Sequence, residues 1–219
     1  MRMWTGWVVV SLVACNGEEG NEPTAGMGEA QTFAFENTGN DNREGHTPRG
    51  FQGQGGGIFT GDNLNDGFPE GDGVQIFISF NLARGADGES LVDDGATTVE
   101  SALLAAAVEP QIEGSPFADL GDLLADEVIH DGFSSALWDL EPPANGGSCV
   151  FATGPNQPFE CDFADAVQNA LDDGRRFLDV RMRFETAGDN DSSQDMVFFF
   201  TQNVNATEPG LFTLDVTAR

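Results

Sequence analysis

Cationic residues are scarce in this sequence. It contains no lysine, nine arginines and two histidines, whereas aspartate and glutamate number 37, so the formal net charge is −28 at neutral pH. Nucleic acids and anionic membrane surfaces attract proteins through clustered Lys and Arg, and this charge balance argues against both as partners. An acidic surface suited to high salt explains the excess of carboxylates without any ligand. The alternative, which assigns the carboxylates a specific ligand, is a calcium-binding surface.

The constellations of nucleophilic catalysis are also missing. No Gly-x-Ser-x-Gly motif occurs, and neither His46 nor His130 lies in a recognisable Ser, Cys or Asp constellation. Carboxylates are so abundant that a glycosidase-like pair could be drawn almost anywhere, which makes their number uninformative. We therefore predict that the protein is not an enzyme.

Aromatic side chains suited to stacking on sugars are few. The chain has no tyrosine, and Trp138 is the one tryptophan beyond residue 7. Trp138 lies in the mostly apolar stretch 136–140, where a core position suits it better than a sugar platform. Phe51, Phe59 and Phe68 lie in glycine-rich segments, but phenylalanine lacks the polar group typical of binding sites.

The first of the three cysteines follows a short apolar run. Arg2 precedes the eleven residues 4–14, and Cys15 comes directly after Ala14. A helix rises about 1.5 Å per residue, so this run cannot cross a hydrocarbon core of about 30 Å, although it suits a secretory signal. The end of the run resembles a bacterial lipobox. The resemblance implies that residues 1–14 are a lipoprotein signal peptide and that lipid on Cys15 anchors the protein to a membrane.

The composition changes again near residue 30. Residues 15–29 are rich in Gly, Glu, Asn, Pro and Thr and bury too little apolar surface to fold, so we predict a flexible tether. Residues 30–219 suit a single domain. We expect an exported protein that is lipid-anchored to the cell envelope. Because Asn16 is not the Asp that retains lipoproteins in the inner membrane of enteric bacteria, we expect the outer membrane or cell surface where two membranes exist.

The other two cysteines flank a loop rich in Gly and Pro. They are Cys149 and Cys161, and we predict a disulfide between them, because disulfides persist in exported proteins. Closing a loop of this length contributes about 3 kcal/mol in the chain-entropy model. A zinc site built on the two thiols lacks further ligands in a chain with only two histidines.

Alternating apolar residues predict several β-strands. One face of residues 74–82 is wholly apolar, and residues 177–185 alternate apolar with charged side chains, which predicts one face toward the core and one toward water. Residues 196–201 are apolar on both faces, as in a covered strand, and residues 212–216 form a last alternating strand. Turns rich in Gly, Asn and Asp separate these strands.

One helix is predicted among the strands. Apolar residues recur at i, i+3, i+4, i+7 and i+8 from Phe163 to Leu171, and Asp162 can cap this helix while Gly174 can end it. Residues 99–108 are ambiguous, since their leucines and alanines favour a helix whereas the flanking residues suit a strand. Short strands with one isolated helix indicate an antiparallel sandwich rather than alternating β-α-β units.

Five segments between residues 50 and 219 resemble a known family. They read QGQGGGIFTGDN (52–63), IFISFNL (76–82), GATTVESALL (95–104), DFADAVQ (162–168) and PGLFTLDV (209–216). In this order they are similar to the DNRLRE-type (disaggregatase-related) domains of microbial surface proteins, although Asn81 stands where that family usually has Asp and residues 84–94 lengthen a loop. The resemblance implies an all-β, antiparallel jelly-roll β-sandwich with one short helix, and it makes residues 99–108 a strand. Some relatives are carbohydrate-binding modules, and others are surface domains.

Two acidic turns carry the hard oxygen ligands that calcium prefers. The candidate ligands are Asp62, Asn63, Asn65 and Asp66 in the first turn, and Asp189, Asn190, Asp191 and Asp195 in the second. The first match is imperfect, because Leu64 stands where an EF-hand-like loop needs Asp or Asn. Asn, Asp and Gly also form turns without a metal, and that interpretation takes precedence for both clusters.

Three classes of function stay open. The favoured prediction is a non-catalytic surface or envelope lipoprotein whose β-sandwich serves display or adhesion. The alternative is a carbohydrate-binding module that recognises a polysaccharide, and aromatic side chains along one face would favour it. A carboxylate-dependent glycan hydrolase comes third and needs two carboxylates about 5–9 Å apart in a cleft. The expected partners are the membrane, through the lipid, and a polysaccharide or another surface protein.

Overall fold

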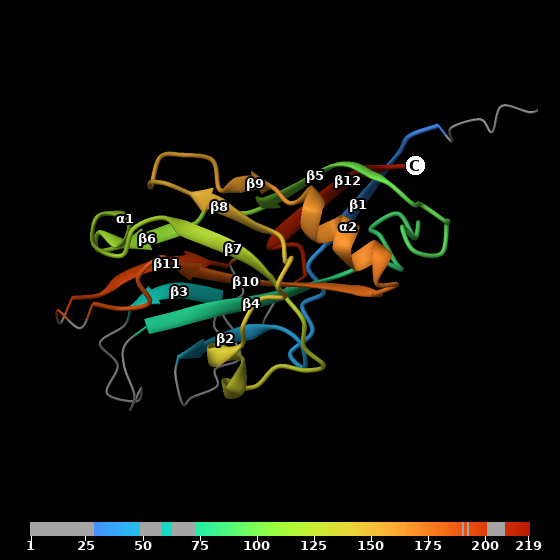
Figure 1. Ribbon diagram of the computed structural model, residues 1–219. Coiled ribbons are helices and arrows are strands. Elements are labelled where there is room, and N and C mark those ends of the chain that lie inside the picture. Colours follow the sequence, from blue (N-terminus) through green and yellow to red (C-terminus); the bar gives the residue numbers. More distant parts are fainter. Residues whose placement is uncertain (1–28, 49–57, 63–72, 190, 192, 201–208) are drawn as a thin grey trace, which may run out of the picture.

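Two antiparallel β-sheets face each other in the computed structural model of this protein (Figure 1), which describes residues 29–48, 58–62, 73–189, 191, 193–200 and 209–219. The smaller sheet has the order β1 (Gln31–Glu36), β12 (Phe212–Ala218), β5 (Val99–Ala106) and β9 (Glu160–Asp162). The larger sheet has the order β6 (Gln111–Glu113), β11 (Asp195–Phe199), β3 (Ile58–Asp62), β4 (Gly73–Asn81), β10 (Phe177–Phe184), β7 (Leu123–Val128) and β8 (Ser148–Ala152), and β2 (Gly45–Pro48) also pairs with β4. The predicted all-β, antiparallel jelly-roll β-sandwich with one short helix is confirmed.

That helix is α2 (Ala164–Asp172), which packs against β5 and β10. The N-cap position is Phe163, and the predicted cap Asp162 lies one residue earlier, where it accepts a hydrogen bond from the backbone N–H of Ala164 at 3.0 Å. At the other end Gly174 follows the last turn with a φ of 64°, as predicted. The Arg175 N–H donates to the Ala170 carbonyl oxygen, which completes a Schellman-type end. A single turn, α1 (Pro116–Asp119), and a 3₁₀ helix, η1 (Ser135–Asp139), accompany α2.

Phenylalanine fills the space between the two sheets. The rings of Phe199 on β11 and Phe212 on β12 lie 4.8 Å apart between their centroids, and Phe151 and Phe159 continue this cluster. Tilted contacts of this kind contribute about 0.5–1.5 kcal/mol beyond the burial of area. The cluster therefore holds the larger sheet to the smaller one.

The predicted inner faces of the strands are buried. All apolar residues predicted for one face of β4 and for the inner face of β10 are at most 2 % exposed. The ambiguous run 99–108 forms strand β5, whose residues pair with β12 on one side and β9 on the other. Pairing on both sides outweighs the helical preference of leucine and alanine here.

The prediction that one face of residues 177–185 meets water is wrong for Asp179 and Arg181, although Glu185 is exposed as predicted. Asp179 and Arg181 are 3 % and 6 % exposed, because the long connection between β7 and β8 covers the outer face of the larger sheet. A second, smaller apolar cluster forms under this cover from Phe77 and Phe133, with Val128 and Leu137. Charged residues of β10 are consequently paired inside the protein rather than hydrated.

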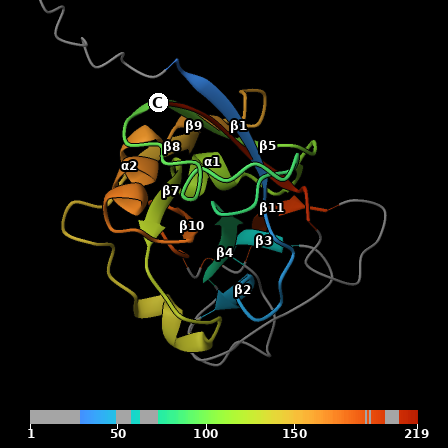
Figure 2. The ribbon, with the colours of Figure 1, turned by 90° about the vertical axis from the view of Figure 1, so that its right-hand side faces the viewer.

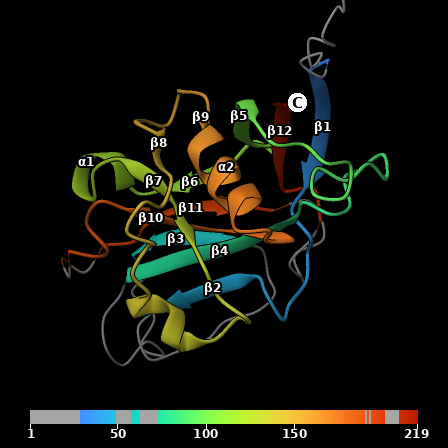
Figure 3. The same ribbon diagram turned by 45° about the vertical axis from the view of Figure 1, so that its right-hand side comes forward.

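The predicted disulfide between Cys149 and Cys161 is present. It joins β8, an edge strand of the larger sheet, to β9, an edge strand of the smaller one, so it closes one side of the sandwich. Figures 1, 2 and 3 place the beginning of β1 beside the end of β12, and Figures 1 and 3 show both at the opposite end of the sandwich from α1.

Candidate functional site

The two predicted calcium clusters meet at one end of the sandwich, beside α1. Asp62 is the last residue of β3 and lies directly opposite Asp195, the first residue of β11. The Asp62 carboxylate accepts hydrogen bonds from the backbone N–H of Asp195 at 3.1 Å and of Asp189 at 3.4 Å. Residues more than 120 positions apart in the sequence thus contact one another here, and we call this region the α1 end.

Asp189 and Asp191 shape the connection between β10 and β11. Both are exposed. Asp189 accepts a hydrogen bond from the N–H of Asp191 at 3.0 Å, and Asp191 accepts one from the N–H of Ser193 at 2.6 Å. Aspartate side chains stabilise turns through such bonds to the backbone two residues further on, so these contacts agree with the turn interpretation.

Asp119 is a member of this acidic region that the sequence patterns missed. It ends α1 and is exposed. Desolvation and then the charges of Asp195, Asp189 and Asp191 raise the pKa of its carboxyl. No spacing rule connects Asp119 with a loop some 70 positions later, so only the packing of α1 on β11 could have identified it.

The metal prediction stays a prediction. Asn63, Asn65 and Asp66 lie outside the described residues. Among the residues that the structure describes, no three His, Cys, Asp or Glu residues are grouped so that they could hold a metal ion.

A groove runs along α1 next to the acidic residues. It has a volume of about 430 Å³ and is lined by Ile112, Pro116, Phe117 and Pro155, with the hydroxyl residues Ser115 and Thr153. Phe117 is half-buried, and its ring lies edge-on to Phe184 and Phe159 at centroid distances of 5.4 and 6.0 Å. The groove combines apolar walls with polar groups, as small-ligand sites commonly do. We call it the α1 groove.

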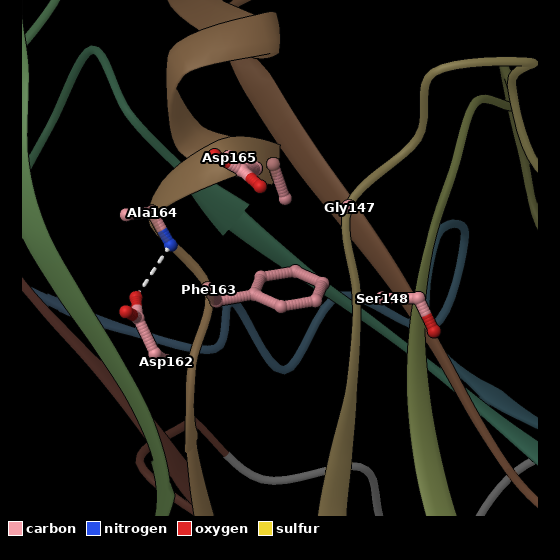
Figure 4. A pocket seen from close by; sticks show the side chains of 7 residues that line it. Gly147, Ser148, Asp162, Phe163, Ala164 and Asp165 are labelled. Atoms are coloured by element: carbon pink, nitrogen blue, oxygen red, sulfur yellow. Dashed lines mark hydrogen bonds between the residues drawn. The ribbon is translucent and has the colours of Figure 1, made fainter.

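A smaller pocket of about 140 Å³ lies at the beginning of α2 (Figure 4). Figure 4 shows the Asp162 carboxylate turned to the first N–H of the helix and the Ser148 side chain pointing away from the pocket. The Ser148 hydroxyl donates instead to Asp126 at 2.9 Å. Asp162 and Asp165 place negative charge where a helix would receive an anion, so this pocket does not suit one.

Serine, histidine and aspartate side chains do come together, on the outer face of the larger sheet. The Ser79 hydroxyl donates to Asp179, and His130 Nε2 lies 3.7 Å from the same carboxylate. Arg43 donates to both carboxylate oxygens at 2.7 and 2.9 Å. In a nucleophilic triad the histidine must contact the serine, whereas here the aspartate lies between them. Burial lowers the pKa of His130, and Ser79 is fully buried. The cluster is an internal polar network.

Other buried charges also pair internally. Asp126 accepts hydrogen bonds from Arg181 at 2.9 Å and from Arg183 at 2.8 Å. Glu127 contacts Arg175 and accepts a hydrogen bond from the Gly147 N–H at 2.7 Å. These pairs join the strands of the larger sheet to each other and to the segments that cover them.

Two aromatic residues that were considered as sugar platforms, Trp138 and Phe59, are half-buried in the structure. Trp138 is half-buried, and its ring lies against the backbone of Gly73. Phe59 is half-buried between His46 and Phe198, at ring distances of 4.1 and 5.4 Å. The strongly exposed large apolar side chains that the structure describes are the aliphatic ones of Leu103, Ile129 and Val150. Phe51 and Phe68 lie outside the described residues.

The sequence was compared with protein-family models and with curated proteins. No protein-family model matches the sequence, and no curated protein matches it. The resemblance to DNRLRE-type domains therefore stays a prediction. Within the described ranges no helix is long and apolar enough to cross a membrane. Residues 1–28, with the predicted signal peptide, Cys15 and nearly all of the tether, lie outside those ranges.

Proposed function

We propose that this protein is an exported lipoprotein whose β-sandwich is displayed at the cell envelope and acts by binding rather than by catalysis. The observation that carries the proposal is the disulfide between Cys149 and Cys161. Structural disulfides persist in oxidising compartments and are rare in the cytosol. With these two cysteines bonded, Cys15 is the one that remains, and it follows the short apolar run expected of a lipoprotein signal.

The orientation of the sandwich agrees with display on a tether. The chain enters β1 at the end of the sandwich opposite α1 (Figures 1 and 3). A lipid on Cys15 would hold that end toward the membrane through residues 15–29. The α1 groove and the acidic residues beside it would then face outward, where a ligand of the surroundings can reach them.

The charge of the chain agrees with an anchor made of lipid alone. Removal of residues 1–14 takes away Arg2, which leaves eight arginines against 37 carboxylates and a formal charge of −29. A domain with this charge is repelled by anionic headgroups. Stable membrane attachment therefore depends on the acyl chains at Cys15.

The test is a Cys15→Ser variant expressed in a bacterial host, with Cys149→Ser as the matched control. We expect the first variant to leave the membrane fraction and the control to stay there. Mass spectrometry of the N-terminal peptide should find a diacylglyceryl group on Cys15 in the unmodified protein. Membrane retention of Cys15→Ser, or an unmodified cysteine in the membrane-bound protein, would contradict the proposal.

A second candidate function is the binding of a polysaccharide in the α1 groove. The half-buried ring of Phe117, with Ser115 and Thr153 nearby, offers an apolar surface together with hydroxyl groups. Affinity electrophoresis in gels that contain soluble polysaccharides tests it. Retardation should occur with the unmodified protein and disappear with Phe117→Ala, whereas Phe177→Ala, a half-buried residue at the far end of β10, should be retarded normally. Equal migration with and without every polysaccharide would eliminate this candidate.

A further inference from the structure

One carboxylate oxygen of Asp195 is buried and has no hydrogen-bond partner among the described residues. The residue is 2 % exposed. Its Oδ1 accepts a hydrogen bond from the backbone N–H of Ser115, whereas Oδ2 is buried and has no hydrogen-bond partner. An unsatisfied buried polar atom costs about 1–3 kcal/mol, and more where it carries charge. Native proteins therefore seldom keep one without a bound water or ion.

A second buried carboxylate lies directly across the sheet. Asp62 is fully buried and opposes Asp195 in the register of β3 and β11. Side chains of directly opposed residues share one face of a sheet, and like charges in such a pair repel. The two aspartates thus bring up to two negative charges to one place at the edge of the core.

The described charged residues near Asp195 are acidic. The charges of Asp195, Asp189 and Asp191 all reach Asp119, so Asp119 lies close to each of them. None of these four residues belongs to any ion pair of the described part of the chain. Elsewhere in the same sheet the buried carboxylates of Asp126, Asp179 and Glu127 each have an arginine partner. Asp195 differs from these three carboxylates, because it has no arginine partner among the described residues.

We propose that the α1 end binds one calcium ion between Asp195 and Asp62, with Asp119, Asp189 and Asp191 supplying an outer ring of negative charge. The ion would use Oδ2 of Asp195 and the Asp62 carboxylate. Calcium takes six to eight oxygen ligands, and backbone carbonyl groups and water commonly supply those that carboxylates do not. Two carboxylates offset its double charge, and the all-oxygen environment suits calcium better than zinc or copper.

The ion has a route to this position. Ser115 and Gly114 contact the Asp195 carboxylate, and both also line the α1 groove. A cation that enters the groove therefore reaches the residues next to Asp195 without any opening of the sheets. This inference concerns a cation and does not depend on a lipid at Cys15 or on a polysaccharide in the groove.

Thermal unfolding and calorimetric titration of the purified full chain with calcium chloride test the proposal. Three variants accompany the unmodified protein: Asp195→Asn, which keeps the shape of the side chain, Asp119→Asn in the outer ring, and Asp87→Asn as a control. Asp87 is exposed in a loop away from the α1 end. The Asp87→Asn substitution removes the same single negative charge as the other two variants. Each melt is recorded in chelator and in calcium, at low and at high sodium chloride.

We expect a calcium concentration 100-fold above the dissociation constant to raise the melting temperature of the unmodified protein and of Asp87→Asn by roughly 5–10 °C. Asp195→Asn should lose this shift, and in chelator it should melt no lower than the unmodified protein, because an uncompensated charge is gone. Asp119→Asn should keep the shift and bind calcium several-fold more weakly. It keeps the proposal testable if Asp195→Asn does not fold.

Three results would overturn the proposal. The first is a melting temperature that calcium leaves unchanged, or that sodium chloride raises equally. The second is a calcium shift that Asp195→Asn retains in full, since the ion would then bind elsewhere. The third is a melting temperature in chelator that rises as the pH falls, together with no effect of calcium. Asp62 and Asp195 would then share a proton instead of a metal ion.

Discussion

His46 should make this protein sensitive to mild acid. It lies on β2 with 7 % of its surface exposed, its ring is 4.1 Å from that of Phe59, and its Nδ1 has no hydrogen-bond partner. Burial lowers the pKa of His46 from 6.5 to about 4. The folded protein therefore resists protonation at a site that the unfolded chain protonates readily.

The direction and size of the effect follow from this difference in pKa. Because the folded-state pKa lies below the unfolded value, the stability is complete above pH 6.5 and is lost as the pH falls toward 4. One pKa unit corresponds to about 1.4 kcal/mol, so the loss is about 2 kcal/mol by pH 5 and about 3 kcal/mol by pH 4. Carboxylates titrate over the same range, and a variant is needed to isolate the histidine.

His46→Phe removes the titrating group and keeps a ring against Phe59. Urea unfolding of the unmodified protein and of this variant at pH 7, 6, 5 and 4 gives the difference in unfolding free energy at each pH. We expect the difference to shift by about 3 kcal/mol in favour of the variant from pH 7 to pH 4. The NMR signals of the two histidines report the pKa directly. A difference that stays flat with pH, or a His46 pKa near 6.5, would refute the reasoning.

Three further predictions concern the stability of the fold. Replacing Cys149 and Cys161 together by Ala should lower the free energy of unfolding by about 3 kcal/mol and the melting temperature by roughly 6–12 °C, and an unchanged melt would show that the bridge does not stabilise the sandwich. Glu127→Ala leaves the mostly buried Arg175 with only the exposed Asp173 as an ion-pair partner and should cost about 3–5 kcal/mol in urea unfolding, so a loss below 1 kcal/mol would count against the buried pair. Phe212→Ala removes a ring from between the sheets and should cost about 3–5 kcal/mol, whereas Leu103→Ala, 41 % exposed, should stay within about 0.5 kcal/mol; similar losses for both would contradict the assigned core.

Local signals in the sequence were sufficient for much of the architecture. The alternation in β4 and β12 identified the residues that face the core, and the residues around α2 marked both of its ends. The disulfide between Cys149 and Cys161 followed from having two cysteines left after Cys15. Each of these features depends on neighbours within a few positions or on a simple count, which is why one sequence revealed it.

The pattern of β10 shows where local signals fail. Its alternating Asp and Arg residues have the same appearance whether that face meets water or a covering segment, because buried ion pairs use the same side chains as a hydrated surface. Glu44 is a similar case. It is fully buried, burial raises its pKa, and it accepts hydrogen bonds from Asn37, Thr38, Gly39 and Ser79. Nothing in its sequence neighbourhood distinguishes it from the exposed glutamates.

The sequence by itself determined the kind of fold and the separate acidic turns at Asp62 and Asp189. Only the tertiary structure decided that these turns meet, that Asp195 lies opposite Asp62, and that α1 brings Asp119 and a groove to the same end. The physical reason is that periodicity and composition act along the chain, whereas a site depends on which strands pair and which segments cover them. Strand register is set by packing over the whole domain.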